Sequence, residues 1–254
     1  MKRKKMKSRR KSPIRMITTE EHHCSIDLRL KILGRLPFFN DLNPSELKRI
    51  NQRFNSLGFN KDDFIYFSED PAERMFVVAE GKIKVFQPGF EKRNVLLDIL
   101  LEGDLFGNLT VFGSSTYADT AQSLTSSCIL SISSQAFGDI LEEFPTLAIK
   151  SLQVMEKRLI AANKRVFEIS TLPVEQRIAV TLLTLGEKLG KKTDQGVLID
   201  APISREDLAE MTAATPETVS RVMKQFQNNG IIDSGRLWVS IIDLVALRKL
   251  VEIE

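Results

Sequence analysis

The 254-residue sequence is poor in the residues that metal and redox sites use, with two cysteines, Cys24 and Cys128, and two histidines. Two cysteines are too few for a disulfide framework or for a cluster held by four thiolates, and their scarcity is typical of a reducing compartment. The sequence therefore gives redox chemistry little support and predicts a cytoplasmic protein.

Long apolar runs are also absent. The longest, such as residues 95–101, are interrupted by Asp98 and are far too short to span a bilayer. The basic start, MKRKKMKSRRKSPIRM, would suit a signal peptide, but the following ITTEEHHCSID is polar where an apolar segment is required. Neither membrane insertion nor export is predicted.

The formal charge of +3 hides an uneven distribution. Nine of the 36 Lys and Arg residues lie in the first fifteen positions, which contain no acid, so the remainder has 27 basic against 33 acidic residues and a net charge of −6. Residues 1–20 are interpreted as a basic, disordered tail, or as an arm that reaches phosphates by electrostatic attraction. Met6 or Met16 could equally be the first residue of the protein.

Residues 21–145 have the pattern of a helix followed by short β-strands. Asn43 and Pro44 begin an amphipathic helix that carries Leu47, Ile50 and Phe54 at helical spacing. Several short strands at close spacing, separated by glycine turns, predict a small barrel or roll. The strand-like segments are DFIYF, RMFVVAEGKIKVFQ, NVLLDILLEGDLFG and SSCILSIS.

Residues 146–172 form one long predicted helix in which apolar residues recur at steps of three and four. Charged and polar residues flank them, so the apolar stripe is narrow. A narrow stripe favours a coiled coil between two copies of the chain over a helix that lies on the core of its own domain. The apolar positions are Leu152, Met155, Leu159, Ala162, Val166 and Ile169.

Pro173 ends that helix, and residues 173–254 are predicted to form a second domain. We expect a strand at GVLIDAP, a hairpin at IIDSGRLWVSII that turns at Ser234 and Gly235, and a last short helix at 244–250. The first helix of this domain presents one apolar face, which consists of Ile178, Leu182, Leu185 and Leu189.

The segment ISREDLAEMTAATPETVSRVMKQFQNNGII predicts two short helices joined by a turn. Ser204 and Thr215 are N-caps, Pro216 begins the second helix and Gly230 follows its end. The polar side of the second helix consists of Glu217, Ser220, Arg221 and Lys224. These side chains match the base edges and phosphates of a DNA major groove. A polar helix face can be merely solvated, but the capped pair, the following hairpin and the dimer helix together favour a DNA-binding helix-turn-helix.

From about Leu33 onward the sequence resembles the Crp/Fnr family of bacterial transcription regulators. LPFFNDLNPSELKRI resembles the family's amino-terminal entry, FVVAEGKIKVF and LLEGDLFG resemble its β-roll, and the segment quoted above resembles its winged helix-turn-helix. The resemblance implies an α+β fold with an N-terminal double-stranded β-helix (a jelly-roll-like β-roll of the cyclic-nucleotide-binding type), a long dimerisation helix and a C-terminal winged helix-turn-helix. It also implies a homodimer that binds double-stranded DNA and acts with RNA polymerase.

The resemblance further implies which DNA is read. PETVSR matches the branch of the family whose recognition helix presents Glu, Ser and Arg and reads TTGA/TCAA-type inverted repeats. The half-sites should lie about one helical turn apart. Glu217 and Arg221 are expected to read bases. Residues expected to position the helix or to contact phosphates are Thr218, Ser220, Lys224, Arg205 and the wing's Arg236.

The effector site departs from the pattern of members that bind cyclic nucleotides. Those members hold the phosphate with a Gly-Glu pair and then an Arg-Ser/Thr-Ala run, whereas this chain has Gly107-Asn108 and Asp119-Thr120-Ala121. A carboxylate repels a phosphate where a guanidinium would attract it. Cyclic AMP is therefore not expected to bind through these contacts.

The long helix departs as well, with Ala162 and Asn163 where a Thr-Ser pair reads adenine in those members. A different small-molecule effector could occupy the same cavity. Alternatively, Phe106, Phe112 and Tyr117 could fill it, and the sequence leaves both possibilities open.

His22, His23 and Cys24 are adjacent, and successive side chains diverge, so HHC is interpreted as a solvated segment rather than a metal or haem site. The iron-sulfur branch of the family needs more cysteines than this chain has, so we expect no such cluster and no other cofactor. An alternative function is a cyclic-nucleotide-binding module that acts through protein contacts, but the winged domain argues against it. Nothing in the sequence suggests an enzyme, because it shows no paired carboxylates, nucleophile triad or phosphate loop.

Overall fold

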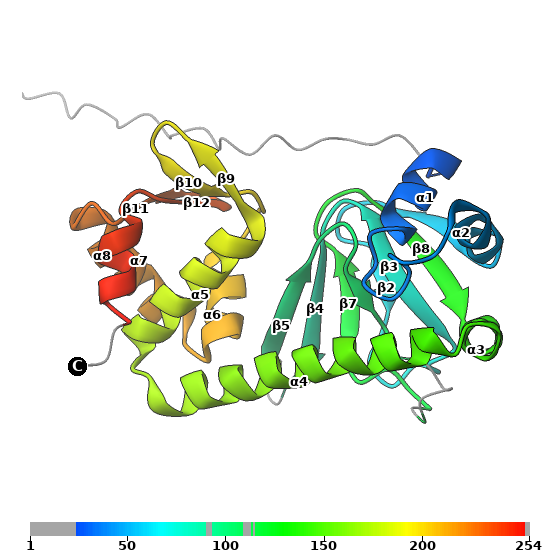
Figure 1. Ribbon diagram of the computed structural model, residues 1–254. Helices are drawn as coiled ribbons and strands as arrows, with labels where there is room; N and C mark the ends of the chain where they lie inside the picture. Colours follow the sequence, from blue (N-terminus) through cyan, green and yellow to red (C-terminus); the bar gives the residue numbers. More distant parts are fainter. Residues whose placement is uncertain (1–23, 90–92, 109–112, 114, 252–254) are drawn as a thin grey trace, which may run out of the picture. The chain divides into compact units, whose positions relative to one another are not determined.

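The computed structural model describes residues 24–89, 93–108, 113 and 115–251. The chain forms two compact units, of which one ends at Ser170 and the other begins at Thr171 (Figure 1). No helix within these described ranges is long and apolar enough to cross a membrane.

The first unit contains two four-stranded antiparallel sheets, which together form the β-roll. Its strands are β1 (Asn55–Phe59), β2 (Phe64–Tyr66), β3 (Arg74–Glu80), β4 (Ile83–Pro88), β5 (Asn94–Leu100), β6 (Leu105–Phe106), β7 (Thr120–Ser123) and β8 (Ser127–Ser133). One sheet has the order β1-β8-β3-β6 and the other β2-β7-β4-β5. Both sheets contribute to one apolar cluster, which includes Phe76 and Val78 of β3 and Val85 of β4.

Four helices accompany the roll: α1 (Ile26–Leu33), α2 (Pro44–Asn51), α3 (Ser134–Glu143) and α4 (Thr146–Thr171). Successive side chains of a strand point to opposite faces, so Met75 and Val77 of β3 face away from Phe76 and Val78. They join a second cluster with Ile32 and Leu33 of α1. This helix-facing cluster, as we call it, attaches the helices to the sheet that contains β8 and β3.

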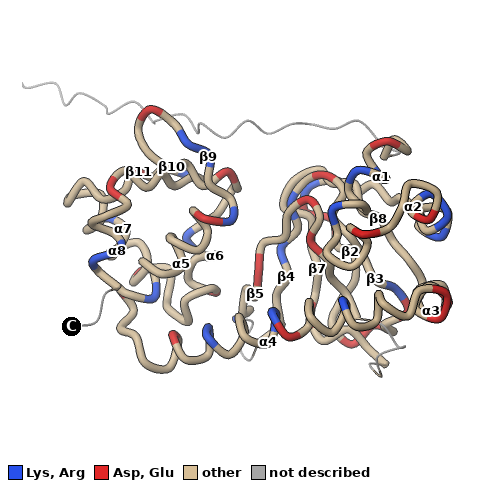
Figure 2. Tube along the Cα trace, in the orientation of Figure 1, with Lys and Arg blue, Asp and Glu red and all other residues tan. Residues whose placement is uncertain are grey.

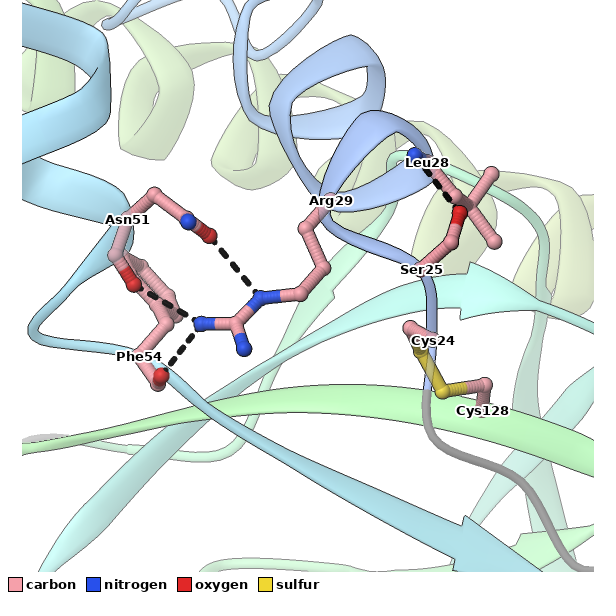
Figure 3. The surroundings of a disulfide bond; sticks show 7 residues. All are labelled: Cys24, Ser25, Leu28, Arg29, Asn51, Phe54 and Cys128. Carbon is pink, nitrogen blue, oxygen red and sulfur yellow. Dashed lines mark hydrogen bonds between the residues drawn. A yellow bond between two sulfur atoms is a disulfide. The ribbon is translucent and has the colours of Figure 1, made fainter.

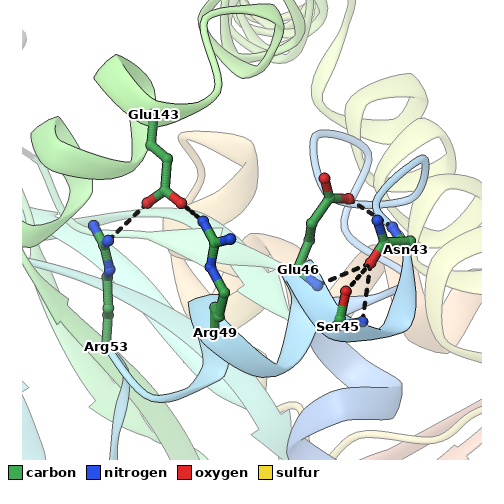
Figure 4. A network of polar contacts seen from close by, with 6 residues as sticks. All are labelled: Asn43, Ser45, Glu46, Arg49, Arg53 and Glu143. Carbon is green, nitrogen blue, oxygen red and sulfur yellow. Dashed lines mark hydrogen bonds and ion pairs between the residues drawn. The ribbon is translucent and has the colours of Figure 1, made fainter.

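Helix α2 begins as predicted but is shorter than predicted. Asn43 accepts hydrogen bonds from the backbone of Ser45 and Glu46, and Glu46 accepts one from the Asn43 backbone, which completes a capping box (Figure 4). The helix ends at Asn51, so Phe54 is not helical, although its side chain is buried in the helix-facing cluster.

An acidic side chain joins α2 to α3. Glu143, at the end of α3, forms ion pairs with Arg49 of α2 and with Arg53 just beyond it, the latter at 2.8 Å (Figure 4). The Arg49 guanidinium also lies 5.7 Å from the ring centre of Phe144. Glu143 thus holds two helices together, and exposed pairs of this kind add about 0–1 kcal/mol each.

Two strands of the roll were not predicted. β1 has the sequence NSLGF and β7 has TAQS, and neither is rich in β-branched or aromatic residues. Each forms because it pairs with a neighbour: β1 pairs with β8 along its whole length, and β7 lies between β2 and β4. Pairing within a sheet outweighs the weak local preference of these segments.

The two cysteines are joined to each other in a disulfide, a bond that their small number did not predict. Cys24 precedes the N-cap of α1, and Cys128 lies in β8 with its side chain in the helix-facing cluster. Their Cα atoms are 6.2 Å apart and the disulfide spans a sequence separation of 104 (Figure 3). Cys24 is 7% exposed, so the expectation that it lies in a solvated segment is wrong. His22 and His23 lie outside the described residues.

Two arginines of α4 hold this long helix against the roll. Arg165 donates to the backbone oxygens of Leu96, at 2.7 Å, and Leu97, both on the edge strand β5. Arg158 donates to the backbone oxygen of Leu105 in β6. Burial lowers the pKa of Arg165 from its ordinary value. Figure 2 shows acidic and basic residues at intervals along α4.

The second unit combines four helices with a small antiparallel sheet of order β11-β12-β10-β9. The apolar face predicted for its first helix is buried. The elements are α5 (Val174–Leu189), β9 (Gly190–Thr193), β10 (Gly196–Ile199), α6 (Arg205–Thr212), α7 (Pro216–Asn228), β11 (Ile232–Gly235), β12 (Trp238–Ile241) and α8 (Leu244–Lys249).

The hairpin β11–β12 turns two residues later than predicted. Gly235 pairs with Trp238, so Arg236 and Leu237 form the turn, and Leu237 takes the left-handed conformation with φ of 61°. A Cβ atom on Gly235 would lie 2.3 Å from Nε1 of Trp238. Gly235 is therefore required for the close approach of the indole, not for the turn. Strand β9, GKKT, was not predicted because its sequence has no apolar side chain, and all four residues are exposed.

Candidate nucleic-acid interface and effector site

Helices α6 and α7 form the predicted helix pair, and local signals set their ends. The Ser204 hydroxyl accepts from the Asp207 backbone at 2.9 Å while Asp207 accepts from the Ser204 backbone at 2.7 Å, which completes a capping box. Ala213 ends α6 in the left-handed conformation, with φ of 49°. Thr215 then caps α7 through a 3.2 Å bond from the Thr218 backbone.

Helix α7 has one buried and one exposed side. Positions three and four apart lie on one side of a helix, which gathers the polar residues into a single row. Glu217, Ser220, Arg221 and Lys224 are all exposed, as the sequence pattern predicts, and Thr218 is half-buried. The buried side consists of Val219, Val222, Met223 and Phe226. We call the exposed row the polar face of α7.

The hairpin β11–β12 is attached to this helix pair. Arg205, the first residue of α6, donates to the Ser234 hydroxyl of β11 at 2.8 Å, and Gln227 of α7 donates to the Ser234 backbone oxygen at 2.9 Å. Burial lowers the pKa of Arg205 from its ordinary value. Arg236 is exposed at the turn of the hairpin. Arg205 therefore has a structural partner that its sequence context did not indicate.

In the β-roll, a tyrosine joins the two halves of the candidate effector site. The Tyr66 hydroxyl donates to Oδ1 of Asp119 at 2.7 Å and accepts a hydrogen bond from the Gly107 backbone. Burial, together with the nearby Asp119 charge, raises the pKa of Tyr66. Burial also raises the pKa of the Asp119 carboxyl, although the Tyr66 hydrogen bond and the charge of Arg158 act to lower it.

The other predicted effector residues lie around this pair in different ways. Thr120 accepts a hydrogen bond from the Ser68 backbone at 3.0 Å, and Ala121 is fully buried in β7. Asn108 is half-buried, whereas Asn163 is exposed on α4. Tyr66 and Arg158 could not be predicted as members of this site, because Tyr66 is 53 residues from Asp119 and no local pattern marks either residue as its neighbour.

Aromatic rings fill the interior of the roll beside Asp119. The Tyr66 ring is stacked on Tyr117 with centroids 3.9 Å apart, and Phe76 and Phe106 are stacked beside it at 5.6 and 6.1 Å. Tyr117 and Phe106 are both buried, as the alternative of a filled cavity requires. The third ring of that prediction, Phe112, lies outside the described residues.

No three His, Cys, Asp or Glu side chains gather into a possible metal site in the part of the chain that the structure describes.

Two family models match the chain. A cyclic nucleotide-binding domain matches residues 57–144, and a Crp-like helix-turn-helix domain matches residues 176–250. The CRP-like cAMP-activated global transcriptional regulator of Mycobacterium tuberculosis is 23% identical over 202 residues, which cover 80% of this chain and 90% of that protein. The transcriptional activator protein Anr of Pseudomonas aeruginosa is 25% identical over 187 residues, which cover 74% and 76%.

The fold is also that of known structures. FixK2 from Bradyrhizobium japonicum matches with a TM-score of 0.70 and 21% identity, over 79% of this chain and 98% of that one. A β-roll, a long helix and a winged helix-turn-helix define a DNA-binding transcription regulator rather than an enzyme. The chain belongs to the Crp/Fnr family.

Proposed function

We propose that the protein acts as a homodimer that reads a TTGA/TCAA-type inverted repeat without cyclic AMP. The polar face of α7 carries this proposal, because Glu217, Ser220 and Arg221 are exposed side by side on a helix that a capped partner helix holds. In the family resemblance, this set of three residues belongs to the branch that reads such repeats.

The proposed DNA contacts come from α7, from the first residue of α6 and from the wing. Glu217 accepts from a cytosine amino group, and Arg221 donates two hydrogen bonds to O6 and N7 of guanine. Ser220, Thr218 and Lys224 contact the backbone or base edges and fix the register of the helix. Arg236, exposed at the wing, contacts a phosphate. Arg205 does so with the nitrogens that its bond to Ser234 leaves over, because only Nη2 is used there.

An exposed apolar stripe on α4 supports the homodimer. Leu152, Leu159 and Val166 are 68%, 61% and 65% exposed in the single chain, and they recur every seven residues. Burying a leucine is worth about 1.5–3 kcal/mol, so a second α4 packed against this stripe would stabilise both copies. A dimer would also present two copies of α7 to the two halves of an inverted repeat.

The Tyr66–Asp119 pair supports independence from cyclic AMP. Asp119 stands where members that bind cyclic nucleotides have a phosphate-binding arginine. The Tyr66 hydroxyl is hydrogen-bonded to both Asp119 and the backbone of Gly107. A phosphate entering here would have to displace these hydrogen bonds and would meet a carboxyl group instead of a cation. The M. tuberculosis relative is named cAMP-activated. We do not extend that property to this chain, because Asp119 and Tyr66 occupy the place where the phosphate would bind.

The remaining parts of the proposal rest on the family and on composition. Residues 21–145 serve as the sensor, 146–172 as the dimerisation helix and 173–254 as the DNA-binding part, and the protein works in the cytoplasm with RNA polymerase. We propose that no iron-sulfur cluster is bound, because the chain has only two cysteines and each is paired with the other.

Selection of bound sequences from a random pool of DNA duplexes tests the proposal. Purified protein would be used without ligand and then with cyclic AMP, at one stated salt concentration, since affinity for DNA depends strongly on salt. Enrichment of a TTGA/TCAA palindrome in both samples is expected. Enrichment only with cyclic AMP would contradict the reading of Asp119, and enrichment of an unrelated sequence would contradict the roles of Glu217 and Arg221.

A further inference from the structure

We infer that the Cys24–Cys128 disulfide is a reversible redox switch that controls how firmly α1 is held on the β-roll, and through α1 the dimerisation helix α4. The inference rests on the proposed function in one respect, namely that a DNA-binding regulator works in the reducing cytoplasm. Disulfides found there are usually transient and redox-sensing rather than permanent. The linked cysteines therefore call for a regulatory explanation.

Helix α1 is attached to the rest of the unit by the disulfide and, separately, by an arginine. Cys24 joins the start of the helix to Cys128 of β8. On another side, Arg29 donates from Nε to the Asn51 side chain and from Nη2 to the backbone oxygens of Asn51 and Phe54, at 2.8, 2.8 and 2.5 Å (Figure 3). A helix of eight residues is not stable by itself, so its order depends on these attachments and on the burial of its apolar side.

Helix α1 is in turn connected to the start of α4. Ile32 and Leu33 of α1 belong to the same apolar cluster as Leu147 of α4, and Val154 packs against that cluster. The first half of α4 therefore rests partly on the segment that the disulfide attaches. Its exposed side carries Leu152, which belongs to the apolar stripe that we propose pairs two copies.

A polar contact makes the same connection. Lys150 of α4 donates to the Asn40 side chain at 2.9 Å and forms an ion pair with Asp41, both in the loop that follows α1. Loss of order in α1 would loosen this loop as well as the cluster. Reduction should therefore weaken the packing beneath the first half of α4 and with it the dimer.

The chemistry requires only common cellular thiols and peroxides. In reduction, a low-molecular-weight thiolate attacks one sulfur of the disulfide, and a second thiolate then releases the first from the mixed disulfide. Cys24 and Cys128 gain two electrons and two protons, and the two small thiols become one disulfide. In oxidation, a hydroperoxide converts one thiolate to a sulfenic acid with loss of alcohol or water, and the second thiol condenses with it and releases water.

Both cysteines are nearly buried, at 7% and 2% exposed, so exchange requires a local opening. Cys24 lies directly before Ser25, the N-cap of α1, and the ends of short helices fray readily. Opening of the first turn of α1 would expose the disulfide to a small thiol without unfolding of the roll. We therefore expect reduction to be slow but complete under native conditions.

The experiment compares the full-length protein in oxidised and reduced form with the variants Cys24→Ala and Cys128→Ala. Alkylation of the denatured protein, followed by mass spectrometry, should find no free thiol after peroxide treatment and two after treatment with a thiol reductant. Hydrogen exchange of α1 amides should become faster on reduction. The dissociation constant of the dimer should rise by a factor of about 5 to 150, the usual range for coupling between sites.

Either variant should behave like the reduced protein and show no response to oxidant. Cys24 lies outside the sheets, directly before the N-cap of α1, so Cys24→Ala keeps the comparison valid if Cys128→Ala, a change within strand β8, fails to fold. Equal exchange of α1 in oxidised and reduced wild-type protein, or two free thiols after oxidation, would overturn the inference. These two readouts do not involve DNA, whereas the proposed function is tested by the selected DNA sequences. Failure of the redox inference can therefore be distinguished from failure of the proposed function.

Discussion

Replacing two neighbouring residues of the polar face of α7 separates base reading from phosphate binding. Arg221 and Lys224 are both exposed, three positions apart on the same side of the helix. Alanine is the best helix former, so neither Arg221→Ala nor Lys224→Ala should disturb α7 or the buried side that supports it. Thermal unfolding of each variant checks that the fold is kept.

The two substitutions should differ in what they do to binding. Arg221→Ala removes a two-bond contact with guanine worth about 1–3 kcal/mol, which is about 5- to 150-fold in affinity for each half-site. The homodimer loses two such contacts on a palindrome, so about 2–6 kcal/mol is expected there if the sites are independent. Lys224→Ala should weaken binding evenly across sequences and reduce the slope of the salt dependence by about one for each lysine removed.

Fluorescence anisotropy with the selected duplex, its single-base-pair variants and a scrambled duplex measures both effects at several salt concentrations. Arg221→Ala should lose discrimination at one base pair of each half-site and bind the scrambled duplex almost as wild type does. If both variants lose the same affinity on selected and scrambled DNA, α7 does not read bases and the argument from its polar face is refuted.

Other substitutions test the dimer helix, the effector site and the core. Leu159→Glu should raise the dissociation constant of the dimer by at least 100-fold, because two leucines worth about 1.5–3 kcal/mol each are lost; sedimentation equilibrium measures this, with Lys157→Glu as control. Asp119→Asn keeps an acceptor for Tyr66 but removes a carboxyl whose pKa burial raises. Protonated Asp119 stabilises the fold fully below its unfolded pKa of about 3.9, and this stabilisation is lost as the pH rises through its higher folded pKa. The free energy of unfolding of the variant, measured with denaturant, should therefore increase relative to that of wild type as the pH rises. Phe226→Ala empties a fully buried position and should cost about 3–5 kcal/mol in the same assay.

The helix pair could be predicted closely because its signals are local. Ser204 and Thr215 cap the helices that begin at the next residue, Pro216 suits a first turn, and the spacing of the buried residues follows from the helix itself. The same holds for the start of α2 at Asn43. The predicted position of the hairpin turn was wrong, because a glycine has more than one possible role. Gly235 is typical of a turn, yet here it is needed for the close approach of Trp238.

Strands without a local signal were missed for the opposite reason. β1, β7 and β9 have compositions that favour no particular structure, and only their neighbours in the sheets make them strands. The partner of such a strand is often far away in the sequence: Asn55 of β1 lies opposite Ser131 of β8. A pattern confined to a short window contains no information about that partner.

The two least expected features, the disulfide and the Tyr66–Asp119 hydrogen bond, are both contacts between segments that lie far apart in the sequence. They join residues 104 and 53 positions apart, and no spacing rule marks either pair in the sequence. Both lie in the sensor part, where the chain also departs from the cyclic-nucleotide pattern, whereas the helix pair follows the pattern of its family. We therefore propose that the interior of the roll has changed the signal to which this regulator responds, while the polar face of α7 keeps the class of DNA site that its branch of the family reads. The thiol measurements and the DNA selection test these two halves of that argument independently.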